Sequence, residues 1–138
     1  MDSLQRKLCD VQGRLFKMSV DRKYESMSFI KTFMSSDIAK GLDSEFDKTQ
    51  WVGEEYLIDE LSSDYKKSLI VGETLDEEVM YWIGYTYRYW HFYTSESSKE
   101  IIKQASPKTM ATNYLMFHTM DPQMAVDNLK EIFKQSKN

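Results

Sequence analysis

Eight of the thirteen residues from Tyr81 to Tyr93 are aromatic, and this density constrains the fold more than any other feature of the chain. On a helix with about 100° per residue, the segment Leu75–Tyr93 places aromatic side chains on two opposite faces. The broad face carries Leu75, Val79, Trp82, Ile83, Thr86, Tyr89, Trp90 and Tyr93, and the opposite face carries Tyr81, Tyr85, Arg88 and Phe92. A helix that is apolar on both faces is covered on both. We therefore expect a central helix in which Trp82 and Trp90 are largely buried.

The N-terminal region has the periodicity of an amphipathic helix. Its apolar residues recur at spacings of four and three: Leu4, Leu8, Val11, Leu15 and Met18. The pattern continues to residue 35, which predicts either one helix over residues 2–35 or two helices with a break near Ser19–Asp21. A short turn of helix is expected at Ile38–Leu42.

The rest of the chain also has the spacing and capping residues of helices. Asp47–Leu61 predicts a helix that buries Trp51, Tyr56, Ile58 and Leu61, and Leu69–Val71 predicts a loop that buries its apolar side chains. The N-caps predicted from Ser, Thr and Asp positions are Thr74, Ser97, Ser106 and Asp121. With only two prolines and five glycines in 138 residues, the sequence favours long helices over a many-turned β fold. We expect residues 1–138 to form a single all-α domain, a compact bundle of five to seven helices around residues 75–93.

Cellular location is indicated by what the sequence lacks. No apolar run approaches the roughly 20 residues of a membrane span. The first residues lack the apolar core of a signal peptide. Cys9 is the only cysteine, so no disulfide can form within the chain. These features predict a cytoplasmic protein.

Charge is distributed unevenly along the chain. Residues 37–78 carry four basic and thirteen acidic groups, a net charge of −9, within a total of −4. The flanking regions are positive, with +3 over residues 1–36 and +2 over residues 79–138. An acidic segment repels nucleic acid and attracts a basic partner, although it can also serve only as a solvated surface.

The face of Tyr81, Tyr85, Arg88 and Phe92 is the predicted interaction site. These residues point away from the pocket that takes Trp82 and Ile83, so they need a second cover from this chain, from a second copy or from another protein. Tyrosine and arginine tolerate water when free and contribute strongly when buried at an interface. Arg88 has an alternative role as an internal anchor that stacks on rings or pairs with an acid.

Two other functions compete with protein interaction. Residues 97–120 have a helix-turn-helix outline, and a DNA-binding regulator could use Lys99, Lys103, Lys108, Thr109, Thr112 and Asn113 for contacts to bases and phosphates. A nucleic-acid- or nucleotide-directed enzyme could use His91 or His118 as a general acid or base. Neither histidine has a nucleophile motif beside it, and the two lie 27 residues apart without metal-site spacing. We therefore expect no metal and no cofactor.

The segment Tyr81–Thr94, with Ser97–Ile101 and Phe117–Pro122, resembles a family of small uncharacterised bacterial proteins. Members of that family are often encoded beside toxin-like genes, including genes that resemble ADP-ribosyltransferases. The resemblance implies a bacterial cytosolic accessory protein or antitoxin and supplies no catalytic residues. The sequence as a whole thus predicts a non-enzymatic protein-interaction module whose partner is a basic, toxin-like protein or a second copy.

Overall fold

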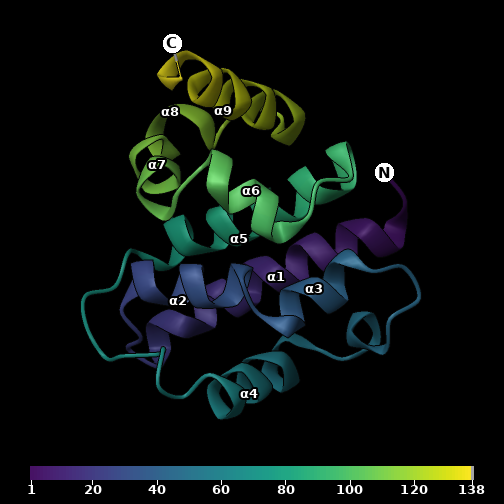
Figure 1. Ribbon diagram of the computed structural model, residues 1–138, viewed down its shortest axis with the longest axis vertical. Coiled ribbons are helices and arrows are strands. Elements are labelled where there is room, and N and C mark those ends of the chain that lie inside the picture. Colours follow the sequence, from purple (N-terminus) through teal and green to yellow (C-terminus); the bar gives the residue numbers. More distant parts are fainter. Residues whose placement is uncertain (138) are drawn as a thin grey trace.

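The computed structural model describes residues 1–137, and within them every regular element is a helix, apart from an isolated β-bridge between Tyr24 and Val71. The elements are α1 (Ser3–Asp21), α2 (Ser26–Met34), α3 (Asp37–Asp43), the 3-10 helix η1 (Lys48–Trp51), α4 (Glu54–Asp64), α5 (Glu77–Thr94), α6 (Ser98–Gln104), α7 (Pro107–Thr112), α8 (Tyr114–Phe117) and α9 (Pro122–Ser136). The predicted all-α bundle is confirmed. These nine α-helices exceed the expected five to seven because residues 97–120 form three short helices. Figure 1 shows α4 and α9 at opposite ends, with α1 and α5 between them.

Helices α1 and α5 pack together more closely than any other pair, and glycine makes this possible. A Cβ atom added at Gly84 would lie 2.6 Å from the carbonyl oxygen of Gln12 and 2.7 Å from the ring of Phe16. The side-chain amide of Gln12 donates to the carbonyl oxygen of Gly84 at 2.9 Å. The absence of a side chain at Gly84 therefore lets the backbone of α1 approach α5 closely.

The burial of α5 differs in part from the predicted faces. Trp90 is fully buried as expected, but Trp82 is only half-buried, and Tyr93 is exposed. Tyr87, which belonged to neither predicted face, is fully buried and donates its hydroxyl to the carbonyl oxygen of Ala105 at 2.7 Å. The most deeply covered side of α5 is thus centred on Ile83, Tyr87 and Trp90, which leaves Trp82 at its edge.

Three of the four predicted N-caps are confirmed. Ser97 forms a capping box with Glu100, and Ser106 and Asp121 each accept a backbone N–H ahead of a proline at the start of the helix. Thr74 is not a cap, because α5 begins at Glu77 after Asp76. The backbone N–H of Leu75 instead donates to the hydroxyl of Ser26 at 2.8 Å, which ties this segment to the start of α2 before the helix begins.

Two loop regions also correct the sequence expectations. The helix predicted over Asp47–Leu61 is interrupted at Val52–Gly53, between η1 and α4. Trp51 and Tyr56, which were expected to be buried, are exposed to solvent. In the predicted loop Leu69–Val71, Leu69 is buried as expected, but Ile70 and Val71 are exposed. The backbone of residues 70–72 pairs with residues 23–25 between α1 and α2, which holds these two side chains at the surface. Residues 22–25 also supply the chain break that the two-helix alternative required, just beyond the predicted position.

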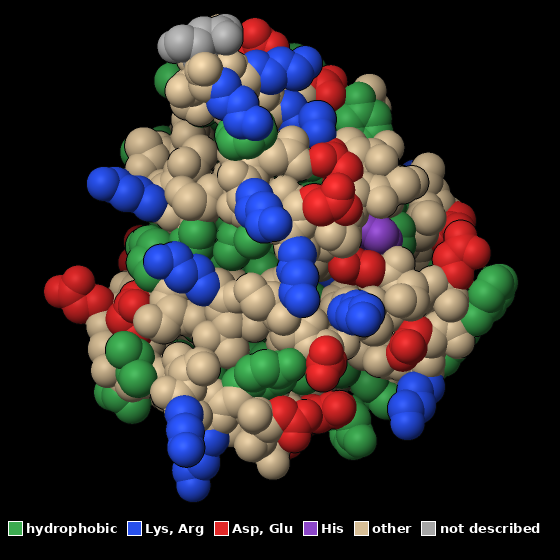
Figure 2. Space-filling model, in the orientation of Figure 1, with side chains coloured by type: hydrophobic (Ala, Val, Ile, Leu, Met, Phe, Trp, Pro, Cys, Tyr) green, Lys and Arg blue, Asp and Glu red, His purple; other side chains and the backbone are tan. Residues whose placement is uncertain are grey.

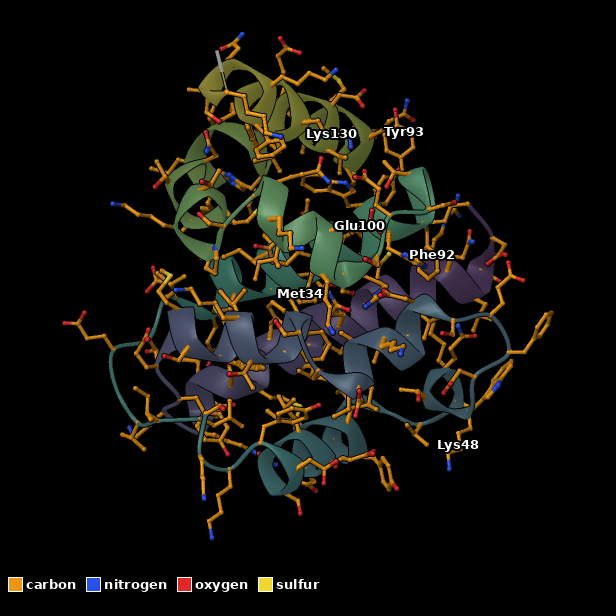
Figure 3. The ribbon with its side chains drawn as sticks, viewed as in Figure 1. Met34, Lys48, Phe92, Tyr93, Glu100 and Lys130 are labelled. Carbon is orange, nitrogen blue, oxygen red and sulfur yellow. The ribbon has the colours of Figure 1, made fainter. Side chains whose placement is uncertain are left out.

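Glu96 fastens α9 to the end of α5. Its carboxylate accepts hydrogen bonds from Lys130, from Gln104 and, at 3.0 Å, from the indole of Trp90. Burial opposes ionisation of Glu96, but these hydrogen bonds outweigh it and lower the pKa of Glu96 to about 2. Figure 3 shows Lys130 and Tyr93 together where α9 crosses the end of α5. None of the helices in residues 1–137 is long and apolar enough to cross a membrane.

Candidate functional site

A groove of about 770 Å³ lies between the first half of α5 and the chain from α8 to the start of α9. Its volume is within the range of ligand-binding clefts. Most of its lining is aromatic or apolar, and charged residues stand beside it. The lining residues are Lys17, Glu77, Glu78, Tyr81, Trp82, Tyr85, Thr86, Tyr114, His118, Met120 and Pro122. We refer to this feature as the aromatic groove.

The rings of the aromatic groove form two groups. Tyr81 and Tyr85 lie 6.0 Å apart between ring centroids. In the other group, Trp82 meets Tyr114 edge-on at 5.7 Å, and Tyr114 stacks on His118 at 4.3 Å. Four of these rings are half-buried, so they present surface to the groove while remaining held by the fold.

Tyr81 is fixed in place by α1. Its hydroxyl donates to Asp10 at 2.5 Å, and its ring lies over Gly13, where an added Cβ atom would approach the ring to 2.8 Å. Burial, followed by the hydrogen bond to Asp10, raises the pKa of Tyr81, and burial likewise raises the pKa of Tyr85. Both phenols are therefore neutral at physiological pH, and the groove wall is rigid on the side of α1.

Thr86 is the most buried residue of the lining, with 1% of its surface exposed. Its burial places it at the floor of the groove, beneath the half-buried rings.

Charge is divided around the groove. Glu77 and Glu78 are exposed in the first turn of α5, and Lys17 is exposed on α1. The acidic end belongs to the segment whose net charge is −9. The groove can therefore receive a group that is apolar or aromatic along its length and positively charged at one end.

The predicted interaction stripe is divided by the fold. Tyr81 and Tyr85 line the aromatic groove, whereas Phe92 lies toward the opposite end of α5, half-buried against the core. Arg88 is fully buried. The prediction that Arg88 belongs to an exposed interaction site was therefore wrong, and its alternative role as an internal anchor agrees with the structure. Asp43 of α3 and Ser98 of α6 bond to Arg88, whereas Tyr81 bonds to Asp10 of α1.

Arg88 joins four helices through its guanidinium group. It donates from Nε to Gln12 at 2.7 Å, from Nη1 to Asp43 at 2.5 Å and from Nη2 to Ser98 at 3.1 Å. Asp43 also accepts from the backbone N–H of Ser98 at 2.9 Å and from its hydroxyl at 2.8 Å. This network fixes the rotation of α5 relative to α1, α3 and α6.

The two histidines occupy different settings. His91 lies beside the Arg88 network, and its Nδ1 is 2.6 Å from the carbonyl oxygen of Glu96 and 3.7 Å from Asp43. Because a carbonyl only accepts, Nδ1 carries the proton. The hydroxyl of Ser98 is bonded to Asp43, so Asp43, His91 and Ser98 do not have the connectivity of a nucleophilic triad. His118 is exposed in the aromatic groove, with Nδ1 2.8 Å from the carbonyl oxygen of Tyr114.

The residues of the helix-turn-helix alternative are distributed over α6, α7 and the end of α7. Lys99, Lys103, Lys108 and Thr112 are exposed, and Thr109 and Asn113 are half-buried. Asn113 donates its side-chain amide to the carbonyl oxygen of Thr109 at 2.8 Å, which caps α7 internally. Helix α7 has six residues, a length of about 9 Å. Figure 2 shows the basic side chains of this face separated by uncharged and acidic surface.

A second exposed aromatic surface lies in the acidic segment. Phe46 is 89% exposed, Trp51 68% and Tyr56 60%. They stand in residues 45–60, which also contain six carboxylates: Glu45, Asp47, Glu54, Glu55, Asp59 and Glu60. Aromatic side chains beside acid are the surface expected of a protein that binds a basic partner.

Sequence reasoning found one wall of the groove and missed the other. Tyr114 and His118 have the i, i+4 spacing of neighbours on a helix, which indicates that they share a face. Nothing local indicates that this face turns toward Trp82. Thr86 was placed on the broad face with no role, and the structure places it in the lining of the groove.

Comparisons with models of protein families, with curated proteins and with solved structures found no match to this chain. Within residues 1–137 there is also no group of three or more His, Cys, Asp or Glu side chains arranged to hold a metal ion.

Proposed function

We propose that this protein is a non-enzymatic interaction module that binds a basic protein partner through the aromatic groove. The observation that carries the proposal is the groove itself: about 770 Å³, walled by half-buried aromatic rings and acidic at one end. Half-buried tyrosine and tryptophan are the residues that dominate binding energy in protein interfaces. Glu77 and Glu78, the two residues of the acidic segment that line the groove, would attract a basic partner to it.

Within this class we favour an antitoxin or accessory protein of a toxin–antitoxin-like locus. The support is the resemblance of Tyr81–Thr94 and the segments after it to proteins encoded beside toxin-like genes. The segment that carries the resemblance also supplies Tyr81, Trp82 and Tyr85 to the groove. A basic toxin-like protein is accordingly the partner of first choice.

The test is co-purification from the native host with matched variants. Tyr85→Ala removes a groove wall, and Tyr56→Ala removes an exposed aromatic side chain elsewhere. Loss of a central interface tyrosine weakens binding by about 30-fold or more, so we expect a bound protein to be retained by the wild type and Tyr56→Ala and lost from Tyr85→Ala. Loss only from Tyr56→Ala would transfer the interface to residues 45–60 and refute the groove as its location.

A second candidate, a nucleotide-directed enzyme, has one observation in its favour, since His118 lies in the groove on a stacked tyrosine. Two glutamates at the same groove oppose the binding of phosphate. Turnover of a nucleotide or RNA that disappears in His118→Ala would establish this candidate and displace the interaction module.

A further inference from the structure

The loop between α3 and α4 exposes its aromatic residues and buries a polar one. Phe46 is 89% exposed and Trp51 is 68% exposed, whereas Gln50, between them in the sequence, is only 9% exposed. Gln50 is held inward because its side-chain amide donates to the carbonyl oxygen of Ser44 at 2.5 Å. Large apolar side chains in solvent beside a buried polar one reverse the usual distribution, which indicates a surface used for binding.

Fixed contacts hold the loop in this form. The carboxylate of Asp47 accepts from the backbone N–H of Thr49 at 2.9 Å and from its hydroxyl at 2.5 Å. Thr49 in turn packs on α3, since a Cβ atom added at Gly41 would lie 2.5 Å from its hydroxyl oxygen. Phe46 has a φ of 63°, a left-handed conformation that is uncommon for a residue with a side chain. The rings are therefore presented by an ordered turn, which reduces the ordering cost of binding.

The charge around these rings is acidic. Residues 45–55 contain four carboxylates and one lysine, a net charge of −3. Glu45 and Asp47 flank Phe46 in the sequence, and Glu55 is exposed in the first turn of α4. Figure 1 shows the loop between α3 and α4 on one side of the molecule and α8, which borders the aromatic groove, on the other. We refer to this separate feature as the η1 surface, made of Glu45, Phe46, Asp47, Trp51 and Glu55.

The charge also decides which occupant fits the η1 surface. A second copy related by a two-fold axis would set the same carboxylates against each other. Nucleic acids and anionic lipids would be repelled for the same reason. A basic polypeptide is the occupant that complements both the carboxylates and the rings.

We propose that the η1 surface binds a basic segment of a partner protein. Apolar side chains of that segment pack on Phe46 and Trp51. Separate cationic side chains of the segment lie beside Glu45 and beside Glu55, and a cation over the indole of Trp51 gains a further attraction. This inference adds a second binding surface to the proposed function and does not depend on the aromatic groove.

The test is a titration followed by ¹H–¹⁵N NMR, with an acetylated and amidated hexapeptide of alternating leucine and arginine as the probe. The indole N–H of Trp51 reports on the η1 surface, and that of Trp82 reports on the aromatic groove. One control peptide has glutamate in place of arginine, and the other has serine in place of leucine. We expect saturable shifts at Trp51 with a Kd of about 0.1–1 mM for the probe, and binding of both control peptides that is weaker by about tenfold or more.

Four variants locate the contact. Phe46→Gly removes the ring at a position whose φ of 63° suits glycine, so the fold is retained while probe binding weakens by about tenfold. Glu45→Gln should weaken binding by about threefold. Lys48→Glu should strengthen it by about threefold, because Lys48 is the one cation in residues 45–55 and extends outward from η1 in Figure 3. The matched control is Leu115→Ala, which removes an apolar side chain of similar exposure from α8 and should leave the Kd unchanged.

Three results would each overturn the proposal: an unchanged Kd in Phe46→Gly, equal binding of the probe and either control peptide, or shifts at Trp82 without shifts at Trp51. The outcome can also be separated from that of the proposed function. If the probe binds at Trp51 as expected but Tyr85→Ala still retains the host partner, the η1 surface stands and the groove is not the protein interface. If Tyr85→Ala loses the partner but the probe leaves Trp51 unshifted, the groove stands and the η1 surface is not a binding site.

Discussion

Replacing Arg88 with methionine tests the internal anchor on which the arrangement of α5 depends. Arg88 is fully buried, and the side chain of Asp43 is only 13% exposed. The substitution leaves Asp43 with the two donors of Ser98 alone and leaves the side-chain oxygen of Gln12 without its partner. Removing one member of a buried ion pair typically costs about 3–5 kcal/mol of unfolding free energy, because the other charge stays buried.

That magnitude is large compared with the total stability of a domain, which is about 5–15 kcal/mol. We expect urea unfolding at pH 7, followed by far-ultraviolet circular dichroism, to show a loss of about 3–5 kcal/mol in Arg88→Met. Arg88→Lys should lose about 2 kcal/mol or more, since one ammonium group cannot reach acceptors on α1, α3 and α6 together. The matched control is Arg22→Met.

Arg22 pairs with Asp59 at 2.5 Å in a setting where the two side chains are 33% and 68% exposed. Exposed ion pairs contribute about 0–1 kcal/mol, so the control should change stability by no more than about 1 kcal/mol. If Arg88→Met costs as little as Arg22→Met with an unchanged dependence on urea, the account of Arg88 as an anchor is wrong.

Three further predictions use the same unfolding assay or a simple thiol reaction. Hydrogen bonds outweigh burial and hold the pKa of Glu96 near 2 in the folded protein. The ionised carboxylate therefore contributes about 2–3 kcal/mol to the free energy of unfolding above the unfolded pKa near 4.5, and this contribution is lost as pH falls toward 2. Glu96→Gln should flatten the pH dependence of stability between these two pH values. Gly84→Ala should destabilise by about 2 kcal/mol or more, since its Cβ atom would lie 2.6 Å from the carbonyl oxygen of Gln12, whereas Gly53→Ala, with nothing within 4 Å, should change stability by less than about 1 kcal/mol. Burial raises the pKa of Cys9 to about 12, so its thiol should resist Ellman's reagent at pH 8 in the folded protein and react quickly in urea; fast reaction without urea would contradict its burial.

Much of the helical organisation could be predicted because its causes are local. The spacing of apolar residues along α1 and the capping residues at Ser97, Ser106 and Asp121 act within a few positions of themselves. Prediction failed where a distant contact overrides the local pattern. Thr74 has the residues of a capping box after it, yet the hydrogen bond between Leu75 and Ser26, 49 residues apart, holds the chain in another conformation.

The candidate site shows the same division between local and distant causes. A helical wheel places Tyr81, Tyr85 and Arg88 on one side of α5, and that placement is sound. It cannot show that Asp43, 45 residues away, pairs with Arg88 and buries it, while Tyr81 and Tyr85 stay half-buried beside the groove. The far wall, including Tyr114, depends on how three short helices pack, which periodicity over four to seven residues does not determine.

The division of α5 into an anchored part and an open part explains how one helix can support both the fold and the groove. The buried guanidinium of Arg88 contacts α1, α3 and α6, so α5 cannot rotate without breaking hydrogen bonds in all three directions. Two turns earlier, Tyr81 is held by Asp10 and Gly13 of α1, and its ring lines the groove. The groove is therefore largely preformed, and preformed walls reduce the ordering cost of binding. A partner's side chain would meet fixed rings at the wall of the groove, so the binding free energy would come from new contacts and not be consumed by rearranging this helix.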